Sequence, residues 1–545
     1  MMVQEYGMVI GQADPSFFDF NIVDRSYRPI AYEYVEVEVE EPQADGAMRK
    51  LQVLGQVKQI TSSHPFYDQR TTPGAAWKQR ELGVGEEMIQ IIATVKILGY
   101  LHEEGGRNEV RRPRSPPMPG TPVYRASDEL LQRLFSLDER ELPLDVGHLL
   151  HRESISVPIS GKELHRHTAI LAMTRYGKSY FAGRIMEQLL RQGASLLVVD
   201  AHGDYANMVQ DPEGHLHAEF WDKVTVFRPA AAEGFEGNHV KSLQLSISAC
   251  SQNELCALAG IDGSLQKIRL RNAMKKVRAK NKFFTLDDLI AELEESLEEA
   301  EEGEEDQAEG KGKKKVSTQE KTRIAGVIDR LKDLNDREIF TEGDINVAEF
   351  FKPMALSDIF FSGLQDSVQD VLVGMILRRV FYAKYRREPW ARLPIFVFVE
   401  EAHRFAAPPD EGGGKFSRDI LARIAAEGAK FGVFLTVISQ RPRRIDPDIL
   451  SNCSNLAILR VVNSQDQRTI QAASESFSED LLGDLPALEQ GEAVLVGPFV
   501  PVPVMIRTAE RETKHGGRTP DIYRLLKDAR DQAEIQRERD KEKLH

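Results

Sequence analysis

The residues that first suggest chemistry lie where an apolar run ends. From Ala169 the chain reads Ala-Ile-Leu-Ala-Met-Thr-Arg-Tyr-Gly-Lys-Ser. Its end matches a phosphate-binding loop, in which backbone amides surround a phosphate, Lys178 reaches the phosphate oxygens and the Ser179 hydroxyl holds Mg²⁺. The apolar run reads as a buried strand, and Tyr180 to Leu190 has helical spacing. The sequence therefore predicts a nucleoside triphosphate site between a strand and a helix.

One position departs from the phosphate-loop pattern. Ala172 stands where that pattern begins with Gly. A methyl group is tolerated there if the residue keeps a negative φ, whereas Gly177, which would lie against the phosphate, has no such latitude. We therefore expect a working loop despite the substitution.

A second apolar run supplies acids. Leu393 to Val399 is continuous, and Glu400 and Glu401 follow it directly. Buried parallel strands open at the carboxyl edge of a sheet, where ligands of such folds bind. Phosphoryl transfer needs one carboxylate for the metal and another group to orient water. We expect Glu400 to serve Mg²⁺ through water and Glu401 to polarise the attacking water. The alternative is a strand followed by a solvated acidic turn.

Two more predicted strands end in polar groups. Ala194 to Asp200 runs into Ala-His-Gly-Asp-Tyr, and Phe431 to Ser439 runs into Gln-Arg-Pro. At the carboxyl edge of the same sheet, Gln440 is placed to sense the γ-phosphate or the attacking water.

In order and spacing, these segments resemble the HerA branch of the HerA/FtsK superfamily of hexameric DNA-pumping ATPases. The resemblance covers about residues 140 to 510. The family favours Asp-Pro-His-Gly-Glu-Tyr where this chain has Asp200 to Tyr205, and Asp-Glu-Ala-His where it has Glu400 to His403. The phosphate loop and the segment from Ser439 complete the match. Short Gly- and Pro-containing segments, 7–11, 53–57 and 119–123, also resemble the small β-barrel that precedes the motor in this family.

The resemblance implies ATP and Mg²⁺ as cofactors and assigns roles to residues. Ser179 and Glu400 would bind the metal, and Lys178, Glu401 and Gln440 would act in catalysis. Asp200, His202 and Asp204 match the family signature, and structural capping of their loop is the alternative role. The expected nucleotide contacts are Arg166, Ala172, Thr174, Arg175, Tyr176, Gly177, Lys178, Ser179 and Tyr180.

The family's arginine finger has no direct counterpart. The family usually carries Gly-Arg-Lys before the last motor strand, and that Arg is thought to reach the γ-phosphate of the neighbouring subunit. Here the segment reads Glu427-Gly-Ala-Lys430. Another cation could take the place of this arginine: Lys430, Arg423, or Arg441, Arg443 or Arg444 in the next loop. For each of them the alternative is an ordinary charged residue on the surface.

The net charge of −14 at first argues against a nucleic-acid partner, because such proteins display basic surfaces. Residues 291–310, however, hold eleven acids and no base, so the rest of the chain is nearly neutral. A translocase grips phosphates through Lys and Arg on loops. The candidates here are Lys415 and Arg418 in the loop from Pro408 to Arg418, and Arg443 and Arg444.

The predicted fold class is α/β. Residues 1–125 alternate apolar and polar in short runs, which predicts a small β-barrel. A RecA-like P-loop ATPase core would be divided between 126–244 and 351–510. A helical insertion, 245–350, separates its two parts and contains an acidic segment, about 298–318, that we expect to be disordered. Residues 511–545 are expected to form a strap and a charged terminal helix.

Composition indicates an intracellular machine. The length of 545 residues suggests three or four domains. Three cysteines, Cys250, Cys256 and Cys453, are too few and wrongly spaced for a disulfide framework or a metal site. No run approaches the roughly 18 apolar residues of a membrane span, and no signal peptide is evident. We therefore expect a cytoplasmic protein with no membrane partner.

The resulting hypothesis is an ATP-driven DNA translocase or helicase that works as a homohexameric ring, is indifferent to DNA sequence and partners a NurA-type nuclease in DNA end resection and repair. Two alternatives stay open. One is a ring that scaffolds a nuclease or sirtuin-like effector in antiphage defence. The other is a largely non-motor scaffold that binds ATP to hold its shape.

Overall fold

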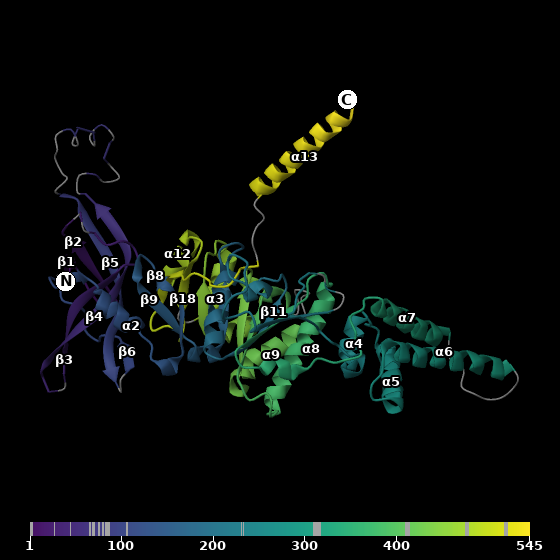
Figure 1. The fold of residues 1–545 in the computed structure, drawn as a ribbon. Coiled ribbons are helices and arrows are strands. Elements are labelled where there is room, and N and C mark those ends of the chain that lie inside the picture. The colour runs from purple at the N-terminus through teal and green to yellow at the C-terminus, as the bar shows by residue number, and fades with distance from the viewer. Residues whose placement is uncertain are drawn as a thin grey trace.

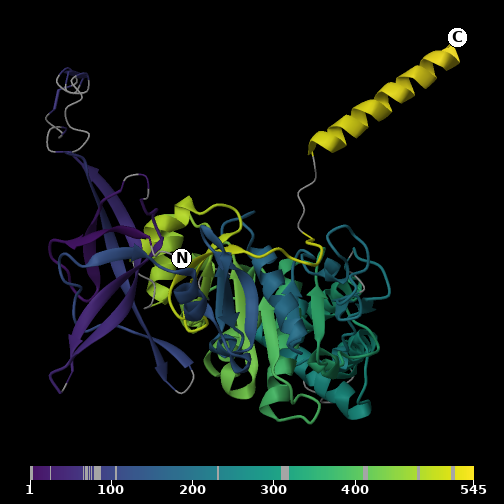
Figure 2. The same cartoon turned by 60° about the vertical axis from the view of Figure 1, so that its left-hand side comes forward.

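The computed structural model describes residues 4–544 except 25, 27, 44, 65–66, 68–70, 73, 75–76, 79–80, 82–87, 105–106, 230–231, 233, 309–317, 409–414, 475–478 and 517–521. A β-domain lies at one end of the molecule, a mixed α/β domain in the middle and a helical arm at the other end (Figure 1). A terminal helix leaves the body in both views (Figures 1 and 2).

The amino-terminal domain is a closed barrel. Its strands follow the order β1-β2-β5-β4-β3-β7, and β7 pairs with β1 to complete the circle. Val35, Val37 and Val39 of β3 alternate along the strand, and all three are buried in the barrel core. Strand β6 extends the sheet beside β5. The strands are β1 (Glu5–Ile10), β2 (Phe17–Ile22), β3 (Tyr34–Pro42), β4 (Met48–Ser63), β5 (Gln90–Glu104), β6 (Arg107–Arg111) and β7 (Pro122–Arg125).

The central domain is built on a twelve-stranded sheet in the order β13-β12-β14-β11-β15-β16-β10-β17-β18-β19-β8-β9. From β13 to β17 neighbouring strands run parallel, and from β17 onward they alternate. The strands are β8 (Pro143–Leu149), β9 (Arg152–Ser160), β10 (Thr168–Leu171), β11 (Ser195–Asp200), β12 (Val224–Arg228), β13 (Val240–Ser242), β14 (Ala355–Phe360), β15 (Ile395–Val399), β16 (Val433–Ser439), β17 (Asn455–Ile458), β18 (Glu492–Val496) and β19 (Val504–Thr508).

Helices cover both faces of this sheet. Adjacent residues of β11 belong to different cores, since Leu196 and Val198 pack with α3 (Lys178–Arg191) while Leu197 and Val199 pack with α8 (Asp366–Tyr385) and α9 (Lys415–Phe431). Burial on both faces explains why these strands read as continuous apolar runs. The expected α/β class, P-loop core and amino-terminal barrel are therefore confirmed.

The helical arm extends from the central domain beside α8 (Figure 1). It consists of α4 (Gln252–Leu258), α5 (Ser264–Lys280), α6 (Leu286–Ala308) and α7 (Thr318–Asn335). Helix α6 begins after Thr285, whose hydroxyl accepts from the Asp288 amide at 3.2 Å. The segment that we expected to be disordered, about 298–318, overlaps the end of α6, and 309–317 lie outside the described residues.

Four short α-helices lie outside the arm: α2 (Asp128–Phe135) joins the barrel to the core, and α10 (Pro447–Ser451), α11 (Ser464–Ala473) and α12 (Glu479–Asp484) follow β16 among the described residues. The terminal helix is α13 (Ile522–Leu544). Across the part of the chain that the structure describes, no helix combines the length and apolar composition needed to cross a bilayer.

Candidate nucleotide site

The predicted phosphate loop connects β10 to α3, as the pattern requires. Gly177 is the amino-terminal cap of α3 with φ 96°, a left-handed conformation that a side chain disfavours. Ala172 is fully buried and does not have a positive φ, so its methyl group meets the condition set by the sequence. Its amide donates to the Ser439 carbonyl at 3.2 Å, which ties the loop to β16.

Lys178 lies between the two acids that follow β15. Its ammonium donates to Glu400 Oε1 and lies 3.2 Å from Glu401 Oε1. The Ser179 hydroxyl donates to the same Glu400 oxygen at 3.2 Å. Glu401 has φ 49°, a left-handed conformation rare for a residue with a side chain and frequent at functional sites. The acidic turn is thus buried rather than solvated, which argues against the alternative interpretation.

Burial and charge act in opposite directions on these groups. Burial disfavours the charged form of Lys178, but Glu400 and Glu401 outweigh it and raise the pKa of the ammonium. Burial raises the pKa of Glu400, and Lys178 only partly offsets it. For Glu401, burial is outweighed by His403 and Lys178, which lower the pKa to about 2. Glu401 therefore stays ionised at neutral pH, as a residue that orients water must.

Gln440 connects the phosphate loop to Glu401. Its amide nitrogen donates to Glu401 Oε1 at 3.4 Å, and its amide oxygen accepts from the Thr174 hydroxyl. His403 Nδ1 lies 3.1 Å from Glu401 Oε2 and 3.3 Å from Ser439 Oγ. The ends of β10, β15 and β16 are thus joined side chain to side chain.

The loop after β11 contributes a tyrosine. Asp200 accepts hydrogen bonds from the amides of His202, Gly203 and Tyr205 at 2.7–3.0 Å, so it caps this loop. Burial and the nearby Asp204 raise the pKa of Asp200 to about 7. The Tyr205 hydroxyl donates to Glu400 Oε2 at 2.7 Å. Glu400, which follows β15, therefore accepts hydrogen bonds from two other elements, α3 and the loop after β11.

Other predicted nucleotide contacts lie in different places. Arg166 is at the opposite end of β10 from the phosphate loop and pairs with Glu163 at 2.8 Å. Within one chain it therefore lies apart from the group formed by Lys178, Glu400 and Glu401. Arg175 is exposed with φ 69°, and Tyr176 lies under the Arg460 guanidinium at 5.0 Å. The Tyr180 hydroxyl accepts from the Arg511 amide at 2.6 Å.

The arginine-finger candidates occupy three separate positions. Arg423 faces α8, where its guanidinium donates to the Tyr382 hydroxyl at 2.9 Å. Lys430 is near the end of α9, before β16 begins at Val433. Arg441 follows β16 and is exposed. Because Ser439 and Leu171 are partners in parallel strands, the candidates that follow β16, which are Arg441, Arg443 and Arg444, lie at the same edge of the sheet as the phosphate loop.

The candidate DNA contacts also differ from the expectation. Lys415 and Arg418 belong to the first turn of α9 rather than to a loop, and 409–414 lie outside the described residues. Arg418 pairs with Asp446 at 2.6 Å, which occupies its guanidinium. Arg443 and Arg444 lie exposed in a short 3₁₀ helix after β16, where Arg443 donates to Gln465 at 2.7 Å.

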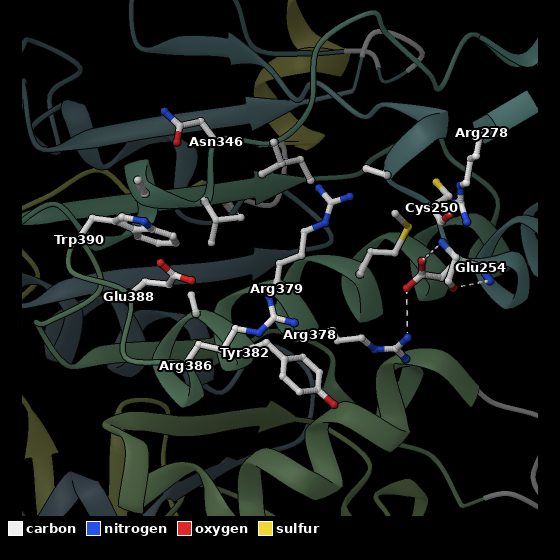
Figure 3. Close-up of a pocket in the computed structure, with 17 residues that line it drawn as sticks. Cys250, Glu254, Arg278, Asn346, Arg378, Arg379, Tyr382, Arg386, Glu388 and Trp390 are labelled. Atoms are coloured by element: carbon white, nitrogen blue, oxygen red, sulfur yellow. Dashed lines mark hydrogen bonds and ion pairs between the residues drawn. The ribbon is translucent and has the colours of Figure 1, made fainter. Parts of the chain in front are cut away.

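A separate cavity of about 650 Å³ lies between the helical arm and α8 (Figure 3). Arg378 pairs with Glu254 of α4 at 3.1 Å, which joins α8 to the arm, and Arg379 pairs at 2.8 Å with Asp344, which lies after α7. None of the predicted site residues lines this cavity. Its charged lining residues are Glu254, Arg278, Arg378, Arg379, Arg386 and Glu388.

Sequence reasoning assigned no site role to Tyr205 and His403. Both stand inside the segments that carried the family resemblance, as the last residue of Asp200 to Tyr205 and of Glu400 to His403. Their positions within those segments were the available signal. The sequence could not show that Tyr205 contacts Glu400, because the two residues are 195 positions apart in the chain.

The donor set suits Mg²⁺ and a phosphate chain. A hydroxyl and a carboxylate, Ser179 and Glu400, meet at 3.2 Å, and oxygen donors of this kind are the ligands that Mg²⁺ prefers. Beside them lies the amino terminus of α3, whose unpaired backbone amides attract anions and which Gly177 caps. The residues present therefore fit a magnesium nucleotide.

Comparisons with known proteins identify the family of the chain. Residues 144–380 match the family model described as the central domain of helicase HerA. The chain is 32% identical to a probable helicase of Methanocaldococcus jannaschii, over 80% of this chain and 79% of that protein. It is 32% identical to the DNA double-strand break repair helicase HerA of Pyrococcus furiosus, over 78% of each chain. Among solved structures, VirB4 of Thermoanaerobacter pseudethanolicus aligns with a TM-score of 0.46 and 16% identity, over 67% of this chain and 96% of that one.

The two ends of the phosphate loop predict opposite responses to substitution. Gly177→Ala places a side chain at φ 96°, which costs about 1–2 kcal/mol, and should weaken ATP binding by roughly tenfold. Ala172→Gly removes a methyl group from a position with no positive φ and should change ATP affinity by less than about threefold. Equilibrium titration with a fluorescent ATP analogue measures both. Equal losses in the two variants would contradict this description of the loop.

Proposed function

The chain belongs to the HerA helicase family, and from that membership we propose that it is an ATP-hydrolysing DNA translocase or helicase. The observation that carries the proposal is the contact of Lys178, on the phosphate-loop helix, with both Glu400 and Glu401 at the end of a parallel strand. A ring-shaped homohexamer is part of the proposal, because a motor of this kind must surround or track its DNA.

Each residue of the site has a task in this proposal. Lys178 would exchange its carboxylate contacts for the phosphates of ATP, which it would neutralise. Ser179 and Glu400 would hold Mg²⁺, and the ion when bound would offset phosphate charge. Glu401, ionised because of His403 and Lys178, would accept a hydrogen bond from the attacking water and orient it.

Gln440 would report the state of the nucleotide. It contacts Thr174 of the phosphate loop and Glu401, and the exposed 3₁₀ helix with Arg443 and Arg444 begins two residues later. A shift of Gln440 would therefore move cationic side chains directly. ATP hydrolysis could in this way move the side chains that bind the phosphate backbone of DNA.

For the partner, we propose a NurA-type nuclease in DNA end resection and repair. The support is the similarity to a protein named as a double-strand break repair helicase. An antiphage ring with a nuclease or sirtuin-like effector has the same motor and would differ only in the bound partner. A non-motor scaffold is the third candidate, and the substituted residues Ala172 and Glu427 to Lys430 favour it.

Steady-state hydrolysis separates motor from scaffold. We expect ATP turnover that linear duplex DNA stimulates, and we expect Glu401→Gln to lower kcat by at least about 100-fold because the water loses its orienting carboxylate. Glu294→Gln, a charge-matched change on α6, should leave turnover unaltered. Turnover that is indifferent to DNA and to Glu401→Gln would instead identify the scaffold.

The arginines after β16 and at α9 should respond differently to substitution. Arg444→Gln should weaken binding of every DNA sequence alike and reduce the slope of log K against log salt by about one, the loss of one phosphate contact. Arg418→Gln breaks the pair with Asp446 and should lower the melting temperature while the salt slope is kept. Fluorescence anisotropy at several salt concentrations, with thermal melts, measures both. The reverse pattern would move the DNA contact to α9.

A further inference from the structure

A strap, residues 509–516, crosses the core before the terminal helix (Figure 2). Its Arg511 is buried against α3, the helix that follows the phosphate loop. The side chain of Arg511 is 1% exposed. Its Nε donates to Thr513 Oγ1 at 3.2 Å and lies 3.7 Å from Glu187 Oε1, while its Nη1 has no hydrogen-bond partner among the described residues. An incompletely paired cation is costly to bury. Its position therefore needs an explanation beyond fastening the strap.

Helix α3 leaves room for this guanidinium. A Cβ built on Gly183 would lie 2.4 Å from Arg511 Cζ, so any larger residue would displace it. On its other side, Arg511 Cζ lies 5.9 Å from the centre of the Tyr205 ring, a distance suited to a cation–π contact. Arg511 thus fills the space between the phosphate-loop helix and the tyrosine that donates to Glu400.

Neighbouring strap residues fix this arrangement. Glu187 of α3 accepts from the Thr513 amide at 2.8 Å and from its hydroxyl at 2.6 Å. The Gly516 amide donates to the Asp204 carbonyl at 3.2 Å, in the loop that carries Tyr205. The strap therefore contacts both elements that converge on Glu400, which are helix α3 and the loop after β11.

We propose that the strap is a positioning element of the nucleotide site, in which Arg511 holds the Tyr205 ring so that the Tyr205 hydroxyl orients Glu400 toward the metal. The inference rests on the function proposed above for Glu400. Arg511 and Tyr205 are positioning residues, since neither contacts Lys178 or Ser179. Loss of either should weaken the part of nucleotide binding that depends on Mg²⁺.

The test compares the affinity for a fluorescent ADP analogue in Mg²⁺ and in EDTA. For the wild-type chain we expect tighter binding in Mg²⁺. Tyr205→Phe keeps the buried ring and removes only the hydroxyl, and it should reduce the Mg²⁺ advantage by about tenfold while the affinity in EDTA stays the same. Tyr34→Phe, which removes a buried hydroxyl from the barrel, is the matched control and should behave as wild type.

The link to the strap is tested by Arg511→Met, alone and combined with Tyr205→Phe. If both residues act along one path, the double variant loses no more of the Mg²⁺ advantage than Tyr205→Phe alone. Independent, multiplying losses would overturn the link, and an unchanged Mg²⁺ advantage in Tyr205→Phe would overturn the whole inference. If the wild-type chain binds equally in Mg²⁺ and EDTA, the role of Glu400 fails first and the inference fails with it.

Discussion

Two carboxylates, Glu400 and Glu401, are buried side by side at the end of β15, and the ammonium of Lys178 makes their burial tolerable. Removing a charge from water is expensive unless an opposite charge and good hydrogen bonds replace the solvent. Here a lysine from the first turn of α3 supplies the charge, while Ser179 and Tyr205 donate hydrogen bonds to Glu400. These contacts also fix the ammonium at the amino terminus of α3, where the proposed function requires it to meet the phosphates.

This requirement dictates much of the surrounding structure. Lys178 can reach Glu400 only if β10 and β15 end at the same edge, and the parallel order of β11, β15, β16 and β10 provides that edge. Parallel strands in turn must be covered on both faces, which α3 on one side and α8 and α9 on the other accomplish. The barrel and the helical arm attach at opposite ends of the central domain (Figure 1).

Much of this could be predicted from the sequence, because the strongest signals are local. The apolar runs that lead to the phosphate loop, to Glu400 and to Gln440 predicted both the strands and their order along the chain. Contacts between distant segments could not be predicted: Arg511 is more than 300 residues from Tyr205, and no pattern of spacing connects them. Arg418, which we expected in a loop, lies instead in the first turn of α9 and pairs with Asp446 of another element, a contact that no local pattern predicts.

The most direct test of the central claim is the stoichiometry and affinity of magnesium-ADP binding, measured calorimetrically for the wild-type chain and for Lys178→Met. If the Lys178, Ser179, Glu400 and Glu401 constellation is the nucleotide site, the wild-type chain binds one nucleotide per chain. The variant should then keep its secondary structure but lose affinity by at least about tenfold, which is 1.4 kcal/mol. Equal affinity in a folded Lys178→Met variant would contradict the account, because the nucleotide would then bind elsewhere.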